Sequence, residues 1–128
     1  MSVELTMLAW SGLLTLAVTL VQGTRNVLVL GLPTAAGNLH NIPAWEGWHD
    51  RLNRSLRNLI EAMIIFAPVV VAAHLSGKAN ETSALGAQLF FFSRLVHAPV
   101  YTIGIPYLRT FAWFGGVVGI IMVGSVFF

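Results

Sequence analysis

The stretch Arg51–Ala73 joins a basic, amide-rich start to an apolar run long enough to cross a membrane, and one carboxylate lies inside that run. On a helix that turns by about 100° per residue, four of its polar side chains fall within roughly an 80° arc: Arg51, Arg54, Asn58 and Glu61. Charged groups inside a bilayer are costly and usually face a bundle interior, a partner or a water-filled cavity. We therefore expect this stripe to form the wall of a polar site that is entered from the membrane surface.

The composition places the whole chain in a membrane. Of its 128 residues, 56% are hydrophobic and 9% are charged, whereas a soluble domain carries about 25% charged residues. One membrane-spanning helix takes roughly 20 residues, so four helices and their connections nearly use up the length. We expect an all-α integral membrane four-helix bundle that forms a single domain over residues 1–128, with any chemistry among the helices.

Several classes of function conflict with this composition. The formal charge of +2, from 7 basic and 5 acidic residues, is too small and too scattered for a nucleic-acid surface. Cysteine is absent, which excludes thiol nucleophiles and Cys-ligated metals in this chain. The histidines show no ligand spacing, so we expect no metal site. The expected surroundings are membrane lipids, with no nucleic-acid partner.

Four apolar segments follow one another along the chain. Their approximate bounds are Leu5–Leu32, Leu52–Leu75, Ser83–Ile103 and Tyr107–Phe128. The first connection, Pro33–Asp50, is long and rich in Gly, Pro and Asn, which predicts a loop. The other two connections, around Lys78 and Pro106, are short, and short connections join antiparallel neighbours. The expected topology is therefore up-down.

The basic residues set the expected orientation in the membrane. Arg51, Arg54 and Arg109 lie at or near the first and third connections, whereas the side with both termini carries only Lys78. Cytoplasmic connections are enriched in Lys and Arg, so both termini are expected outside and the polar site is expected to open to the cytoplasm. Three tryptophans on the Arg-rich side fit an interfacial belt: Trp45, Trp48 and Trp113.

A second polar stripe lies in the third apolar segment. Arg94, His97 and Tyr101 fall within roughly a 60° arc of one helix face, which we interpret as a second polar wall opposite the first. The alternative is structural: His97 and Tyr101 are satisfied core residues, and Arg94 pairs with Glu61 or another acid. The first stripe has a structural alternative too, in which its arginines reach the lipid headgroups and Glu61 neutralises one of them.

Two further arginines are candidates for the same site. Arg25 follows Gln22 in the first segment, and Arg109 opens the fourth segment just after Pro106. Either arginine can instead be a simple anchor at the membrane surface. The N-terminus of a helix favours anions, however, and Arg109 would strengthen that preference. A pocket with many cationic donors and one carboxylate suits a ligand that carries carboxylates and one ammonium group.

These polar residues occur in motifs that resemble a known family. The run Arg54–Glu61 fits R-[AS]-x-x-N-x-x-E, a signature of the MAPEG family, the membrane-associated proteins in eicosanoid and glutathione metabolism. The run Arg94–Tyr101 fits R-x-x-H-x-x-x-Y, a pattern of the prostaglandin E synthase branch of that family. The chain therefore resembles a bacterial-type MAPEG member, similar to microsomal glutathione transferase and prostaglandin E synthase.

The resemblance implies a homotrimer in a bacterial inner membrane, with glutathione bound between neighbouring subunits. It implies a catalytic role for Arg109, which resembles the fourth-helix arginine that stabilises the glutathione thiolate. It also implies that the second substrate is a lipophilic small molecule that arrives through the bilayer, between the first helix of one subunit and the fourth of the next. The glutathione-binding residues that it implies are Arg25, Arg54, Arg57, Asn58, Glu61, Arg94, His97 and Tyr101.

The expected function is therefore a membrane-embedded, glutathione-dependent transferase or isomerase that acts on a lipophilic electrophile. One alternative is a non-catalytic lipid- or ligand-binding protein on the same scaffold. Another is a small proton-coupled transporter with Glu61 as its proton carrier, against which the surrounding arginines argue because they repel cationic substrates. Gly115 and Gly119 have small-xxx-small spacing, which we interpret as close helix packing and not as chemistry.

Overall fold

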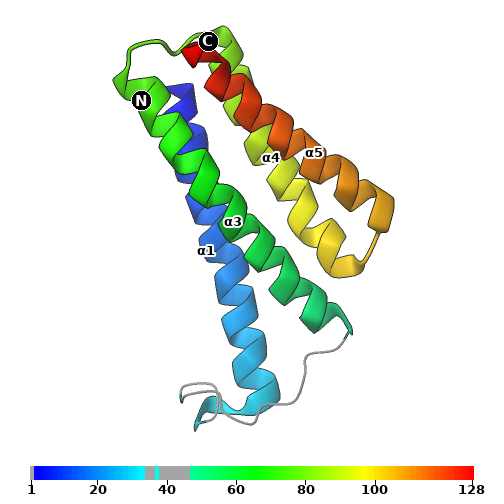
Figure 1. Cartoon of the computed structure of the whole chain (residues 1–128). Coiled ribbons are helices and arrows are strands. Elements are labelled where there is room, and N and C mark those ends of the chain that lie inside the picture. Colours follow the sequence, from blue (N-terminus) through cyan, green and yellow to red (C-terminus); the bar gives the residue numbers. More distant parts are fainter. Residues whose placement is uncertain (1, 34–36, 38–46) are drawn as a thin grey trace.

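The computed structural model describes residues 2–33, 37 and 47–128, which form a bundle of long antiparallel helices (Figure 1). The elements within these residues are α1 (Val3–Leu30), α3 (Gly47–Leu75), α4 (Glu81–Ile103), α5 (Pro106–Gly124) and the short 3₁₀ helix η1 (Ser125–Phe127). The helices run alternately in opposite directions, so both termini lie at the same end of the bundle (Figure 1). The all-α, up-down fold expected from the sequence is confirmed.

Local sequence signals set the ends of the helices. Ser2 caps α1, because its side chain accepts a hydrogen bond from a backbone N–H of the first turn at 3.2 Å. Asn80 and Ser83 form a reciprocal capping box at the start of α4, which satisfies N–H groups that the helix itself leaves open. α4 ends at Gly104, whose φ of 96° lies in the left-handed region that glycine adopts most readily. Pro106 then starts α5, a position in which its missing N–H costs nothing.

α1 continues without a break through the polar run 22–26. The reason is that polar side chains of this run pair with α3. Gln22 Nε2 donates a hydrogen bond to Asn53 Oδ1, and His49 Nε2 lies 3.0 Å from Asn26 Oδ1. The run is therefore the polar part of an interhelical contact and not a helix end.

α3 begins at Gly47 instead of Leu52, so residues 47–50 of the expected loop are helical. The Asp50 carboxylate lies in the first turn, where it is favoured by the helix dipole. Asp50 also pairs with Arg54, one turn further along, at 2.9 Å. The rest of the expected connection, 34–36 and 38–46, lies outside the described residues, and Trp45 lies there too.

Two stacked phenylalanines and several glycines organise the packing between the helices. Phe66 of α3 and Phe90 of α4 are fully buried, with ring centroids 3.8 Å apart. A Cβ added at Gly119 of α5 would lie only 2.6 Å from the carbonyl oxygen of Gly86 in α4, and Gly115 is similarly close to α4. The prediction that the glycines of the last helix serve close packing is confirmed.

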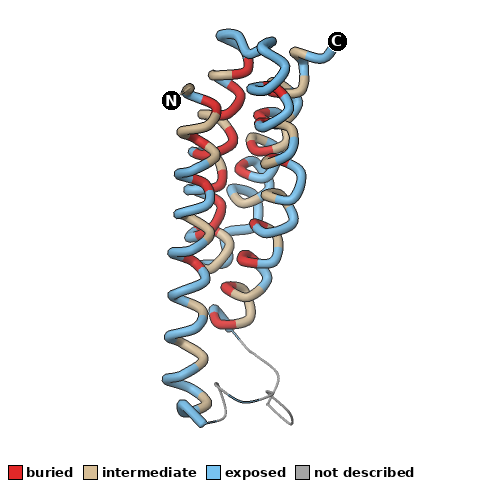
Figure 2. Tube along the Cα trace, turned by 90° about the vertical axis from the view of Figure 1, so that its left-hand side faces the viewer, coloured by how far each residue is buried: buried red, intermediate tan, exposed pale blue. Residues whose placement is uncertain are grey.

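Within the described residues, three segments are long and apolar enough to cross a membrane: α1, α3 and Pro106–Phe127. α4 is also long, with 23 residues, but Gln88, Arg94 and His97 lower its hydropathy. It packs against all three other long helices, and Arg94 and His97 are buried there. Buried residues line the inside of the bundle and exposed ones its outside (Figure 2). Because many exposed residues are large and apolar, this outer surface fits a lipid environment.

Candidate functional site

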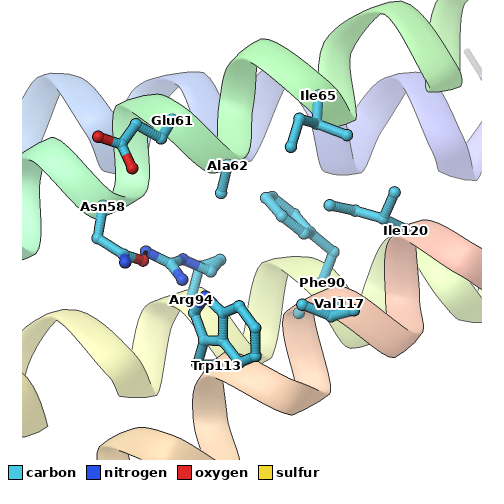
Figure 3. Close-up of a pocket in the computed structure, with 10 residues that line it drawn as sticks. Asn58, Glu61, Ala62, Ile65, Phe90, Arg94, Trp113, Val117 and Ile120 are labelled. Atoms are coloured by element: carbon cyan, nitrogen blue, oxygen red, sulfur yellow. Dashed lines mark hydrogen bonds between the residues drawn. The ribbon is translucent and has the colours of Figure 1, made fainter.

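A pocket of about 210 Å³ lies between α3, α4 and α5 (Figure 3). One end of it is polar and is formed by Asn58 and Glu61 of α3 and by Arg94 of α4. Trp113 of α5 lines the pocket next to Arg94 (Figure 3). The other end is apolar and is lined by Ala62, Ile65, Phe90, Gly116, Val117 and Ile120. Polar and apolar walls therefore meet in one space.

Arg94 is the buried cation of this pocket. It is 2% exposed, and its Nη2 donates a hydrogen bond to Asn58 Oδ1 at 2.8 Å. Gly116 leaves room for its stem, because a Cβ at Gly116 would lie 3.3 Å from Arg94 Cδ. Within the described residues, Arg94 has no ion pair, and its Nε has no hydrogen-bond partner. Arg94 thus pairs with an amide and not with Glu61, and its charge is not neutralised by the described part of the chain.

The hydrogen bond from Arg94 fixes the direction in which the Asn58 amide points. A guanidinium can only donate, so the amide oxygen faces Arg94 and the amide NH₂ is turned away. That NH₂ makes no hydrogen bond to another described residue. The site therefore offers an oriented donor to an acceptor group on a ligand.

A second pocket, of about 280 Å³, adjoins the first toward the connection between α4 and α5. His97 and Tyr101 line it from α4 and Arg109 lines it from α5, while Asn58 and Trp113 line both pockets. The Arg109 guanidinium carbon lies 4.7 Å from the centroid of the Tyr101 ring. His97 is buried, and its Nδ1 has no partner among the described residues. The two polar stripes of the sequence therefore meet at Asn58.

Glu61 separates the first pocket from a third one, of about 380 Å³, on the side of α1. Gln22 and Asn53 line this third pocket together with Arg57. Neither Glu61 nor Arg57 makes a hydrogen bond or an ion pair with any residue that the structure describes. Both side chains are exposed, and charges in a membrane-spanning helix are costly when they lack partners, so these two groups are open to a ligand, to another chain or to lipid headgroups.

Two arginines of the predicted stripe, Arg51 and Arg54, point away from the pockets. Arg54 forms an exposed ion pair with Asp50 of its own helix, at 2.9 Å. Arg51 donates from Nε to the carbonyl oxygen of Thr102 at 2.9 Å, near the end of α4, where carbonyl groups lack donors within the helix. Long basic side chains can leave the face on which their Cα atoms lie. The structure therefore places neither arginine beside Asn58 in a single subunit.

Arg25 lies apart from the three pockets as well. Its guanidinium carbon lies 4.6 Å from the centroid of the Trp48 ring, and both residues line a shallow pocket on the outer side of α1. Arg25 and Arg54 are thus the two predicted binding residues that lie outside the site of a single subunit. The others line one of its three pockets: Arg57, Asn58, Glu61, Arg94, His97, Tyr101 and Arg109.

Sequence reasoning missed two aromatic residues of the site. Trp113 was expected only in an interfacial belt, yet it lies one helical turn after Arg109 and lines two pockets. Phe90 lies one turn before Arg94 and forms part of the same wall. The spacing of four residues places each of them on the same helix face as its arginine, and this signal was present in the sequence.

The fold and the site together define an integral membrane helix bundle with a polar pocket between its helices. A comparison with protein-family models is more specific, because the model of the MAPEG family matches residues 4–127. The chain belongs to the MAPEG family, which includes glutathione transferases and related membrane proteins. No match was found among curated proteins or among solved structures.

Proposed function

We propose that this protein is a glutathione-dependent transferase or isomerase that acts on a lipophilic electrophile within the membrane. The observation that carries the proposal is the junction of the first two pockets at Asn58 and Trp113. Around this junction lie two guanidinium groups, an oriented amide and a phenol, with a carboxylate at its edge. An apolar recess opens directly from it. Such a site matches a charged thiol peptide on one side and an apolar second substrate on the other.

In this proposal, each polar group of the site binds a different part of glutathione. Glu61 accepts a hydrogen bond from the ammonium group, since it is the unpaired carboxylate of the site. The NH₂ of Asn58 and the guanidinium of Arg57 donate to carboxylates. Arg94 acts through Asn58, whose amide it orients.

Arg109 stabilises the reactive form of the thiol. The thiolate is the nucleophile, and a free thiol is largely protonated near neutral pH. A guanidinium placed beside the sulfur lowers the pKa of the bound thiol, and the released proton passes to water. In the transferase reaction, the sulfur forms a bond to the electrophilic carbon and the leaving group departs with its electron pair. The protein contributes a preorganised positive charge and no nucleophile of its own.

A homotrimer completes the site in this proposal. Glu61 and Arg57 have no partners within the described residues, and members of this family form trimers. A neighbouring subunit can bring its Arg25 to the glutathione bound beside Glu61, a position that Arg25 does not reach within its own subunit. Cross-linking and native mass spectrometry in mild detergent should give three copies, and a stable monomer or an antiparallel dimer would contradict the shared site.

The test of function combines binding and turnover on the purified protein. Glutathione affinity is measured by calorimetry, and conjugation is measured with a generic aryl halide. Glu61→Gln should weaken glutathione binding by roughly 1.5–3 kcal/mol, the contribution of a hydrogen bond to a charged group. Glu81→Gln, at the exposed start of α4, is the matched control and should bind as the wild type does.

Two outcomes would change the assignment. Unchanged affinity in folded Glu61→Gln would show that glutathione does not use this site. Glutathione binding without any conjugation, across several classes of electrophile, would assign the chain to non-catalytic ligand binding on the same scaffold.

A further inference from the structure

We propose that the apolar end of the first pocket binds the reacting part of the lipophilic substrate, and that it accepts a group about the size of one substituted aromatic ring. The proposal deepens the proposed function and rests on it. This apolar recess lies between α3, α4 and α5 of one subunit. Its walls are Ala62, Ile65, Phe90, Gly116, Val117 and Ile120.

The recess is continuous with the site proposed for the thiol. Asn58 and Trp113 line both the pocket that contains the recess and the pocket that contains Arg109. Trp113 lies beside Arg94 at the polar end, with Val117 and Phe90 beyond it (Figure 3). A ring that fills the apolar end would therefore have one edge toward Trp113. A leaving group on that edge faces the sulfur, so the two substrates meet where the pockets join.

The size of the pocket limits what it can hold. A buried cavity of about 150 Å³ lined by Leu, Ile and Phe is large enough to bind benzene. The first pocket measures about 210 Å³ with its polar end included, so the apolar end alone has room for no more than about one ring. Its inner end is fixed, because Phe90 stacks on the fully buried Phe66. One ring with small substituents fits this space, whereas a long acyl chain would have to extend out of it.

The two substrates reach the site from different sides. Ile65, at the apolar end, is 54% exposed on a helix that is apolar enough to span the membrane. The recess therefore opens beside Ile65 at the depth of the membrane-spanning part of α3, one helical turn from Glu61. The polar pocket of His97 and Arg109 lies toward the Arg-bearing end of the bundle, from which a charged peptide arrives.

Neighbouring residues of α5 provide a matched pair of variants. Val117 lines the recess, whereas Val118 is 45% exposed and does not line it. Val117→Phe should lower kcat/KM for a chlorodinitrobenzene by roughly tenfold or more, because even one methylene in an apolar pocket changes discrimination by about 10–200-fold. Val118→Phe should stay close to the wild type, and glutathione affinity should be unchanged in both. Equal loss in both variants, or no loss in Val117→Phe, would overturn the proposal.

Photolabelling tests the recess without relying on catalysis. A phenyl diazirine should label Ile65, Val117 or Ile120 in the solubilised protein, and an excess of the aryl halide should compete. Val117→Phe should lose this labelling and Val118→Phe should keep it. Labels found only on the outer face of α1 would refute the recess. If labelling lies in the recess but the wild type neither binds glutathione nor conjugates it, the proposed function fails while the ring-binding site stands.

A second matched pair enlarges the recess and covers the case in which Val117→Phe does not fold. Ile120 lines the recess, whereas Ile121 is 65% exposed. Ile120→Ala should increase labelling by a naphthyl diazirine relative to the phenyl probe, and Ile121→Ala should not. The same ratio of naphthyl to phenyl labelling in both variants would contradict the position of the recess.

Discussion

Glu4 and Glu61 are both acidic residues of membrane-spanning helices, yet their surroundings are opposite. Glu4 lies near the end of the bundle that holds the termini, is 4% exposed, and accepts a hydrogen bond from the Ser83 hydroxyl at 2.6 Å. Glu61 is exposed beside the pockets and has no hydrogen bond or ion pair to a described residue. One carboxylate is buried and satisfied, and the other is open and unsatisfied.

The different surroundings of these two carboxylates distinguish polar groups that stabilise the bundle from polar groups that are available to a ligand. Ser83 also accepts a hydrogen bond from the Asn80 N–H at 2.8 Å in the capping box, so Glu4 ties α1 to the start of α4. Buried polar groups in folded proteins nearly always have such partners. An unpaired charge in a membrane-spanning helix is costly as well, so Glu61 is a candidate for contact with a ligand or a neighbouring subunit, which supports the proposed function.

The largest expected effect comes from the charge beside the reacting sulfur. Arg109→Leu should lower kcat/KM for conjugation by about 100-fold or more, since removing one preorganised donor to a developing anion costs about that much. Glutathione affinity should change little, because in the proposed site Arg109 acts on the sulfur while the other groups hold the peptide. Calorimetry and initial rates on the same preparation check both statements.

The alternative for Arg109 is a headgroup anchor, and Arg54→Leu provides the comparison. Arg54 is paired with Asp50 on the exposed side of α3. Arg54→Leu should therefore leave the rate of conjugation near that of the wild type. An equal fall in rate for both variants would remove Arg109 from the reaction and make Arg94 or Tyr101 the better candidate.

Arg94→Met should separate stability from binding. Burying an unpaired charge is costly, and an apolar side chain of similar volume removes that cost, so thermal unfolding should occur at the same or a higher temperature. Glutathione affinity should fall by roughly 1.5–3 kcal/mol, because the Asn58 amide loses the group that orients it. A variant that unfolds more easily and still binds glutathione normally would make Arg94 a structural residue.

Ser83→Ala should have the reverse effect, with lower stability and unchanged glutathione binding. It leaves the buried Glu4 carboxylate without its donor, which costs about 1–3 kcal/mol, and the bundle should unfold at a lower temperature. Glutathione binding should be unchanged, because Ser83 lies at the opposite end of α4 from Tyr101. A loss of glutathione affinity in the folded variant would contradict the separation of the two regions.

The smallest effect is expected for the stability of Glu61→Gln. Because Glu61 has no partner in the described chain, its loss should change the free energy of unfolding by less than about 0.5 kcal/mol, as for most surface substitutions. The unfolding temperature without glutathione checks this, and Ser83→Ala is the positive control. A marked destabilisation would reveal a partner in a neighbouring subunit.

The helices were predictable because apolar length and cap residues are local signals. The starts of α4 and α5 follow from Asn80 and Pro106, which act within one turn. The start of α3 and the unbroken course of α1 were not predictable, since the latter depends on contacts such as that of Gln22 with Asn53. Such contacts form only when the two helices are already side by side.

The site was predictable to the extent that helix geometry fixes it. Asn58, Arg94 and Tyr101 line adjoining pockets, as their stripes indicated. Helical angles did not show that Arg51 reaches the end of α4, because a long side chain selects among several acceptors. They also gave no sign of the apolar recess, whose walls come from three helices and exist only in the packed bundle.

In the proposed function this pocket binds glutathione and holds it as a thiolate, and ultraviolet absorbance measures the thiolate directly. At neutral pH and saturating glutathione, the wild-type protein should show a thiolate band that neither the protein nor glutathione shows alone. The band should disappear in Arg109→Leu and persist in Arg54→Leu. Bound glutathione without a thiolate band in the wild type, or the same band in both variants, would contradict the account.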